Sequence, residues 1–206
     1  MVKPVLSAIV LVAALVPALG RAEAVRPNVD FAGVVEPVGS KRAAMQDLIF
    51  DLATAWADCN VEAMTSAVAD TVKFSYPTTA YEGKATMLKD LETFCGQATD
   101  TSIFFPADAF YIDVDSGRIA AELQFRTFQR GNRQVVNDVW VATIADDKIT
   151  VIKEYLDGRV KDLQAQGVLQ LEESPEFLTP WPPRTEAWEA CFPIAKSAPI
   201  NTCPPT

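Results

Sequence analysis

Residues 118–156, RIAAELQFRTFQRGNRQVVNDVWVATIADDKITVIKEYL, carry the strongest structural pattern in the chain. Apolar and polar side chains alternate along residues 118–129, which is the period-two pattern of a strand with one buried face. Gly131-Asn132 and Asp146-Asp147 supply the small and polar residues that tight turns favour. We therefore predict three consecutive antiparallel strands, at residues 118–129, 134–144 and 148–156.

Upstream of these strands the apolar pattern takes the period of a helix. Apolar residues recur every three or four positions over residues 45–59, and Asn60 can end this helix and cap a second one at residues 61–68. A third helix carries residues 87–95. It is followed by Gly96, where a helix end favours a left-handed residue.

Two further strand signals complete the central part of the chain. Residues 72–76 alternate as a strand that Pro77 stops, and residues 102–114 form one or two strands interrupted by Pro106. Helices that come first and are separated from a meander of strands indicate an α+β fold. We expect a curved antiparallel sheet wrapped around an N-terminal helical layer.

The first 24 residues are typical of a secretory signal peptide. A positive start at Lys3 precedes an apolar run from Val5 to Leu19, and Ala22-Glu23-Ala24 forms a small-x-small cleavage site. The alternative is an uncleaved membrane anchor, although the run is shorter than the roughly 20 residues that span a bilayer. We expect cleavage after Ala24, a periplasmic or secreted protein, and no membrane span in the mature chain.

The remaining chain divides by composition into three parts. Residues 25–42 contain prolines and glycines without a period and are predicted to be a linker, and residues 43–165 form the domain. Residues 166–206 form an extension that holds eight of the 14 prolines. Trp181 and Trp188 lie in this extension and predict that it packs onto the domain, where it could cover the mouth of a pocket.

The four cysteines are expected to form disulfide bonds in an oxidising compartment. Three connectivities are possible, and the predicted helix ends favour Cys59–Cys95, which leaves Cys191–Cys203 to tie the proline-rich extension. A zinc site would need all four thiolates at irregular spacing, and Asp113 and Asp115 fail the twelve-residue calcium-loop pattern. We expect no metal site.

Composition excludes several classes of function. The chain has 206 residues and no histidine, which rules out a Ser-His-Asp triad, a Cys-His pair and a histidine-ligated zinc. Acid–base chemistry must therefore use carboxylates, tyrosine, lysine or water. The formal net charge of −9 repels phosphate backbones and argues against a nucleic-acid partner.

Two stretches of the chain resemble the nuclear transport factor 2-like superfamily, which includes the ketosteroid isomerases and the polyketide-cyclase-like (SnoaL-like) proteins. Residues 69–77 with Tyr81-Glu82-Gly83-Lys84 are similar to the family's first strand and following helix entry. Residues 138–144 and 148–157 are similar to its last two strands. The resemblance covers residues 43–165 and implies a cone-shaped sheet whose open end holds a mostly apolar pocket.

The resemblance also directs attention to Tyr76. In the isomerases a catalytic carboxylate precedes the proline that ends the first strand, and Tyr76 holds that position here. A phenol with a pKa near 10 is a poor base at neutral pH. Tyr76 is therefore a candidate hydrogen-bond donor to a ligand carbonyl, and plain packing is the alternative.

Asp138 is the most suggestive carboxylate in the sequence. It lies in an apolar strand on the same face as Val136, Trp140 and Ala142, so burial should raise its pKa. The alternative is an ion pair with Arg126 or Arg133 on the neighbouring strand. The ligand-binding candidates are Tyr76, Asp138 and Trp140.

Glu154 and Asp157 lie at the end of the last strand. They are an odd number of residues apart, so only one of them can face the inside of the cone. Asp157-Gly158 is a turn signal, which favours a capping role for Asp157. An acid in this region can be catalytic in the cyclase-like branch, and this makes Asp157 a further catalytic candidate beside Asp138 and Tyr76.

Three functions follow, and none of them needs a cofactor. The leading one is an exported protein that binds a small apolar molecule without converting it. The alternatives are an isomerase, cyclase or dehydratase that uses Asp138 and Tyr76, and a partner-binding subunit whose sheet face also allows a homodimer. Two or more polar groups that converge in the pocket would favour the enzyme, whereas a single polar group would favour the binder.

Overall fold

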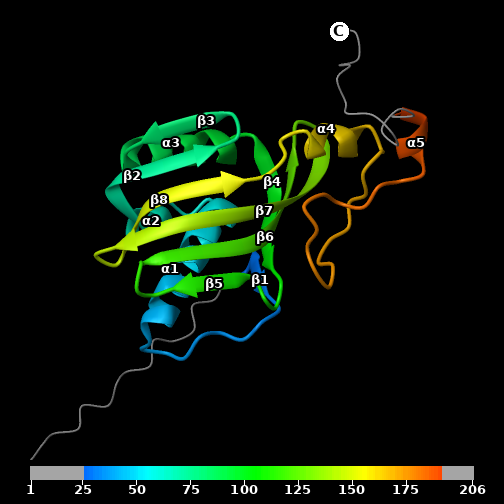
Figure 1. Ribbon diagram of the computed structural model, residues 1–206. Coiled ribbons are helices and arrows are strands. Elements are labelled where there is room, and N and C mark those ends of the chain that lie inside the picture. Colours follow the sequence, from blue (N-terminus) through cyan, green and yellow to red (C-terminus); the bar gives the residue numbers. More distant parts are fainter. Residues whose placement is uncertain (1–25, 192–206) are drawn as a thin grey trace, which may run out of the picture.

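The protein is described by a computed structural model that covers residues 26–191 (Figure 1). The predicted signal peptide at residues 1–24 and the predicted Cys191–Cys203 bond lie outside the described residues and side chains. The elements run in this order: β1 (Val29–Phe31), α1 (Lys41–Ala57), α2 (Val61–Ala67), β2 (Val68–Tyr76), β3 (Thr79–Glu82), α3 (Lys84–Cys95), β4 (Ala98–Phe105), β5 (Phe110–Asp113), β6 (Arg118–Gln129), β7 (Asn132–Ala145), β8 (Lys148–Tyr155), α4 (Val160–Ala165) and α5 (Ala187–Cys191).

The α+β prediction is confirmed. The strands form one curved sheet in the order β1-β4-β6-β7-β8-β2-β3, with β5 paired to β6. β6, β7 and β8 are the predicted antiparallel meander. Two pairings at the flanks are parallel, β1 with β4 and β2 with β8, because the helical layer separates each first strand from its later partner.

The helices begin and end close to their predicted positions. The Asn60 side chain accepts a hydrogen bond from the Ala63 amide at 3.0 Å and so caps α2, as expected. The left-handed conformation expected at Gly96 is wrong, since its φ is −71°. The chain continues in a helical turn there, in which the Gln97 amide bonds the Phe94 carbonyl.

Several short elements have no counterpart in the prediction. β1 lies within residues 25–42, where a linker was expected, and β3 follows directly on the turn at Pro77. Both are too short to show a clear alternation. α4 and α5 lie in or next to the proline-rich extension and have six and five residues.

One face of the sheet is covered by α1, α2 and α3, and we call it the inner face (Figure 1). Leu52 of α1 and Leu91 of α3 pack there in one apolar cluster with Ile119 and Leu123 of β6. Trp140 of β7 belongs to the same cluster. The residues that alternate with these along each strand point to the opposite face of the sheet, which we call the outer face.

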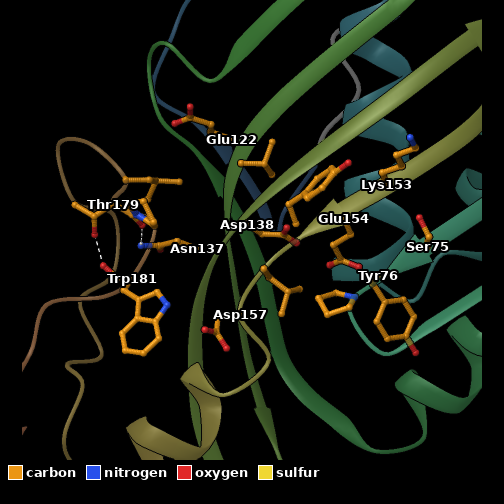
Figure 2. A pocket seen from close by; sticks show the side chains of 16 residues that line it. Ser75, Tyr76, Glu122, Asn137, Asp138, Lys153, Glu154, Asp157, Thr179 and Trp181 are labelled. Atoms are coloured by element: carbon orange, nitrogen blue, oxygen red, sulfur yellow. Dashed lines mark hydrogen bonds between the residues drawn. The ribbon is translucent and has the colours of Figure 1, made fainter. Parts of the chain in front are cut away.

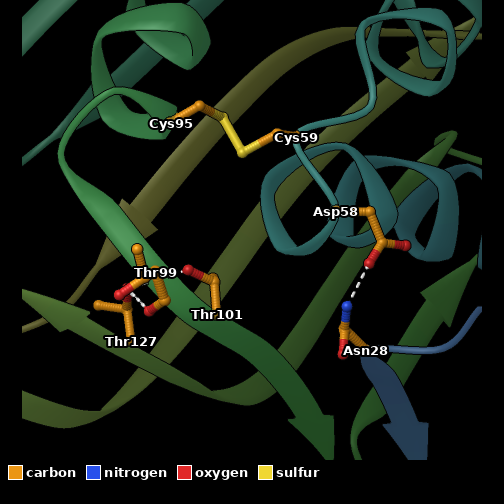
Figure 3. The surroundings of a disulfide bond; sticks show 7 residues. All are labelled: Asn28, Asp58, Cys59, Cys95, Thr99, Thr101 and Thr127. Carbon is orange, nitrogen blue, oxygen red and sulfur yellow. Dashed lines mark hydrogen bonds between the residues drawn. A yellow bond between two sulfur atoms is a disulfide. The ribbon is translucent and has the colours of Figure 1, made fainter.

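The Cys59–Cys95 disulfide fastens the helical layer, as predicted (Figure 3). Cys59 follows α1 and Cys95 ends α3, and their Cα atoms are 5.9 Å apart. Among the residues that the structure describes, no helix is long and apolar enough to cross a membrane.

The C-terminal segment, which we define as residues 160–188, packs against an edge of β7. Pairing between β7 and β8 starts at Val139 and Tyr155, so residues 132–138 extend past the end of β8. The Gln164 amide of α4 fills this edge, since it accepts from the Val135 amide at 3.0 Å and donates to the Val135 carbonyl at 2.8 Å. A single side-chain amide thus satisfies the backbone groups of Val135, which no strand reaches on this side.

The two tryptophans of this segment pack as predicted. Trp188 is buried in a second apolar cluster with Val160, Val168 and Leu169. Trp181 packs edge-on against Trp188, with the ring centroids 5.6 Å apart. The extension is therefore part of the folded domain as far as residue 188.

We predict that removing the disulfide lowers the free energy of unfolding by about 3–4 kcal/mol, because the bond closes a loop of 36 residues in the unfolded chain. The double variant Cys59→Ala/Cys95→Ala should show this loss in urea titrations. Adding a reductant should destabilise the wild type by a similar amount and leave the variant unchanged. Equal stability of the two proteins under oxidising conditions would contradict the prediction.

We predict that Gln164→Ala lowers the free energy of unfolding by about 2–4 kcal/mol, since it leaves the buried amide and carbonyl of Val135 without partners. Gln166→Ala is the matched control, because Gln166 is exposed on the same turn of chain. Thermal unfolding measures both. A Gln164→Ala variant as stable as Gln166→Ala would show that water replaces the amide.

Candidate functional site

A cavity of about 660 Å³ opens where β2 and β8 end (Figure 2). It is lined by residues 75–77 of β2 and its turn, by Glu122, by residues 137–139, by residues 153–157 and by residues 178–181. The strands contribute its inner wall and floor, and the C-terminal segment contributes the opposite wall. The cavity exists at this point because β8 ends before β7 does.

Asp138 lies at the floor of this cavity on the inner face of β7. Its side chain is only 3% exposed. One carboxylate oxygen, Oδ2, accepts a hydrogen bond from Nε1 of Trp140 at 3.1 Å. The other oxygen, Oδ1, is buried and accepts no hydrogen bond of ordinary geometry from the described residues.

Glu154 on β8 supplies a second carboxyl group at the same place (Figure 2). It is paired across the sheet with Trp140, two residues from Asp138, and so shares the inner face with both. A proton on Glu154 creates a hydrogen bond between the two carboxyl groups. The two acids therefore form one unit, which we call the carboxyl pair.

The proton of the carboxyl pair belongs on Glu154. Burial raises the pKa of Glu154 well above its usual value, and the charge of Asp138 and the hydrogen bond to it raise this pKa further. Burial also raises the pKa of Asp138, but hydrogen bonds from Glu154, the Val139 amide and Trp140 oppose the shift. The pair therefore titrates as one unit, and it keeps a proton to higher pH than an isolated glutamate would.

Three polar groups from other elements surround the carboxyl pair. Tyr81 of β3 donates to Asp90 of α3 at 3.0 Å, and burial together with the Asp90 charge raises the pKa of Tyr81 above its usual value. The negative charge of Asp90 also raises the pKa of Glu154. Tyr76 of β2 lines the cavity close by (Figure 2). The surroundings are acidic and contain two phenols.

The predicted site residues thus separate into two groups. Asp138, Trp140 and Tyr76 come together on the inner side of the sheet, with the parity that the sequence pattern implied. Asp157 lines the cavity but bonds elsewhere. Its carboxylate accepts from the Arg159 amide at 3.0 Å and from the Arg159 guanidinium at 2.6 Å, which lowers the pKa of Asp157.

The alternative of an ion pair between Asp138 and a neighbouring arginine is wrong. Arg126 lies on the outer face, where it donates to Gln124 at 2.9 Å and to Ser174 at 2.7 Å. Arg133 binds Asp100 at 3.0 Å and Glu173 at 2.8 Å. Arg126 is also buried, at 5% exposure, because the C-terminal segment covers it.

The wall formed by the C-terminal segment is fastened directly beside Asp138. Asn137, the next residue along β7, is buried on the outer face and donates to the Thr179 carbonyl at 2.8 Å. Gln124 donates to Asn137 at 3.0 Å and to the Glu172 carbonyl at 3.0 Å. These bonds hold residues 178–181, and with them Trp181, at the cavity (Figure 2).

Glu154 is the member of the carboxyl pair that was not named as a catalytic candidate from the sequence, although it was one of two acids of which one could face the inside of the cone. The alternation along the last strand did indicate that Glu154 shares a face with Ile152, and Ile152 is fully buried. Only the cross-strand register, which sets Glu154 opposite Trp140, shows that it meets Asp138. In residues 26–191 no group of three potential ligands could hold a metal ion.

We predict that stability falls as pH rises from about 4.5 toward the raised pKa of Glu154. The folded protein keeps the proton of Glu154 in this window, whereas the unfolded chain releases it. The slope for one proton is at most about 1.4 kcal/mol per pH unit. Glu154→Gln should flatten this part of the profile because Gln cannot ionise. Urea titrations across the window measure both proteins, and identical slopes would contradict the assignment.

Comparison with known proteins agrees with this architecture. The sequence model described as the SnoaL-like domain matches residues 49–152. No curated protein matches the chain in sequence. Residues 49–152 span most of the helical layer and of the sheet, include Asp138, and stop before Glu154 and the C-terminal segment.

Three solved structures share the fold at low sequence identity. PrhC from Penicillium brasilianum is 15% identical, with a TM-score of 0.53, and the match covers 62% of this chain and 93% of that one. TsrD from Streptomyces laurentii is 16% identical, with a TM-score of 0.52 and coverage of 62% and 98%. An NTF2-like protein from Anabaena variabilis is 12% identical, with a TM-score of 0.51 and coverage of 63% and 98%.

Proposed function

Because the chain belongs to the SnoaL-like domain family, we propose that it catalyses a cofactor-independent acid–base reaction on a small, largely apolar molecule, as an isomerase, cyclase or dehydratase does. The observation that carries this proposal is the carboxyl pair at the floor of the cavity. Two polar groups converge on one point, and this favours an enzyme over the simple binding protein that was the leading expectation from the sequence.

The two carboxyl groups have different roles in the proposed reaction. Glu154 is the more accessible member and carries the proton, so it is the group that exchanges a proton with the substrate. Asp138 is buried behind it and held by Trp140, so it acts as a positioning residue that keeps the proton on Glu154 at neutral pH. Asp138 was one of three catalytic candidates from the sequence, with Tyr76 and Asp157, and in this proposal Glu154 takes the catalytic role instead.

One proton suffices for a complete turnover. Glu154 gives its proton to an oxygen, nitrogen or carbon of the substrate and becomes a carboxylate. It then takes a proton from a neighbouring position of the same molecule and returns to its starting state. This sequence rearranges or closes the substrate, or removes water from it, with no net consumption of protons or electrons.

The walls of the cavity fit a small, mostly apolar substrate. Leu178, Pro180 and Trp181 present apolar surface from the C-terminal segment, and Tyr76 presents its ring from β2. The volume of about 660 Å³ lies within the range of about 300–1,000 Å³ that small-molecule sites occupy.

The test is exchange of hydrogen between solvent and the molecule that the protein retains. Native mass spectrometry of protein purified from its source identifies the retained molecule. Incubation in D₂O then follows deuterium incorporation into that molecule. We predict incorporation with wild type and a loss of about 100- to 10,000-fold with Glu154→Gln.

Glu62→Gln is the matched control for this experiment. Glu62 is exposed on α2 and does not line the cavity, so exchange should continue at the wild-type rate. Asp157→Asn should loosen the turn at Arg159 and leave exchange in place. A retained molecule that wild type never labels would make the protein a binder and overturn the proposal.

We also propose that the protein is exported to the periplasm or secreted. The disulfide between Cys59 and Cys95 supports this proposal, because such bonds persist in oxidising compartments. Edman sequencing of the protein from its source should give Val25 as the first residue. A homodimer through the outer face stays a prediction. It would have to form around the C-terminal segment that covers Arg126 and Asn137.

A further inference from the structure

The carboxyl pair carries a negative charge that no side chain of the described protein balances. Asp138 is almost fully buried, and neither Asp138 nor Glu154 forms an ion pair with a lysine or arginine in residues 26–191. Oδ1 of Asp138 has no donor unless a proton or a ligand supplies one. Burying an unbalanced carboxylate costs several kcal/mol, and a fold that only had to be stable would avoid it.

The cations near the cavity do not pair with the carboxyl pair: two arginines are bound to other groups, and Lys153, which lines the cavity, lies on the other face of the sheet from Glu154. Arg159 is bound to Asp157, and its guanidinium lies over the Trp181 ring at 5.5 Å. Lys153 alternates with Glu154 on β8, so its exposed side chain lies on the outer face (Figure 2). Arg126 is fastened to the C-terminal segment on that same face.

The groups that face the pair from the neighbouring elements are acidic or phenolic. Asp90 from α3 adds a second negative charge, and Tyr76 from β2 and Tyr81 from β3 add aromatic rings. Trp181 adds a further ring at the mouth of the cavity. Carboxylates combined with aromatic faces are the surroundings in which proteins bind organic cations.

We propose that the carboxyl pair receives a positively charged nitrogen of the ligand, so that the substrate class is a small, largely apolar amine bound as its ammonium form. The nitrogen donates to the Glu154 carboxylate, the charge of Asp138 behind it strengthens the attraction, and the apolar part of the ligand lies against Trp181 and Leu178. This inference rests on the proposed function of the same site and names the polar group of its substrate. A carboxylate or phosphate ligand is excluded by charge repulsion from Asp138 and Asp90.

Binding of an ammonium ion displaces the proton of the pair. In this proposal the free site holds one proton, on Glu154. Afterwards it holds two carboxylates and one ammonium group, and one proton has passed to solvent. For an amine substrate the proton cycle of Glu154 therefore begins with its carboxylate, which takes a proton from the substrate and later returns it. Affinity for the amine should therefore rise with pH, by up to tenfold per pH unit, until the free site has lost its proton or the amine loses its own. A neutral ligand that accepts a hydrogen bond from Glu154 shows the opposite slope.

Three probes with one ring and different charge test this inference: benzylamine, benzyl alcohol and benzoate. Their dissociation constants are measured from pH 6 to 8 by following the Nε1–H signal of Trp140, which lies in the site. We expect benzylamine to bind at least tenfold more tightly than benzyl alcohol, and benzoate not to bind. Calorimetry in two buffers with different heats of ionisation should show that one proton is released with benzylamine.

Two variants assign the effect to the pair. Glu154→Gln should abolish proton release and the pH dependence while Asp138 still attracts the cation. Glu62→Gln should change neither, because Glu62 is exposed on α2 and does not line the cavity. Benzylamine that fails to bind, binds no more tightly than benzyl alcohol or releases no proton would overturn the inference.

The outcomes separate this inference from the proposed function. A protein that labels its retained molecule with deuterium but does not prefer benzylamine keeps the catalytic proposal and loses the ammonium ligand. A protein that prefers benzylamine with proton release but never labels its retained molecule is a binder of amines, and only the catalytic proposal fails.

Discussion

The early end of β8 is the constraint on which the other features of this structure depend. β8 pairs with β7 only from Val139 onward, so residues 132–138 need another partner for their backbone groups. The Gln164 amide meets part of that need, and it brings the C-terminal segment to the edge of the sheet. The space left beyond Tyr155 becomes the cavity, with strand ends on one side and residues 178–181 on the other. One short strand thus accounts for both the extension and the site.

The sequence predicted the features that follow from periodicity and failed where long-range register decides. Alternation placed Asp138 with Trp140 on one face, and the helical stripes brought Cys59 and Cys95 to one end of the helical layer. Glu154 was missed because its role arises only when β8 is aligned opposite Trp140. The environment of Arg126 likewise depends on a long-range contact. Its burial comes from a segment nearly 50 residues further along the chain, which bonds it through Ser174.

The energetics of the carboxyl pair favour a functional explanation over a structural one. Two acids buried side by side repel each other, and neutralising one of them with a proton removes only part of the cost. The hydrogen bond from Trp140, the neighbouring backbone amides and the shared proton keep the arrangement compatible with folding. They do not make it more stable than a pair of apolar residues of the same size would be. A destabilising arrangement at the floor of a cavity is the kind of feature that ligand binding or catalysis explains.

The alternation of side chains along each strand is enough to place the acids of the carboxyl pair and their sequence neighbours on opposite faces of the sheet. Along β7 Asn137 points to the outer face and Asp138 to the inner face, and along β8 Lys153 and Glu154 do the same. Arg126 and Asn137 therefore lie on the outer face, where they hold the C-terminal segment. Asp138 and Glu154 lie on the inner face. A lysine shifted by one residue would neutralise the carboxyl pair and close the site to an ammonium ligand. The same strand register thus places Asn137 where it holds residues 178–181 and keeps lysine side chains away from the carboxyl pair.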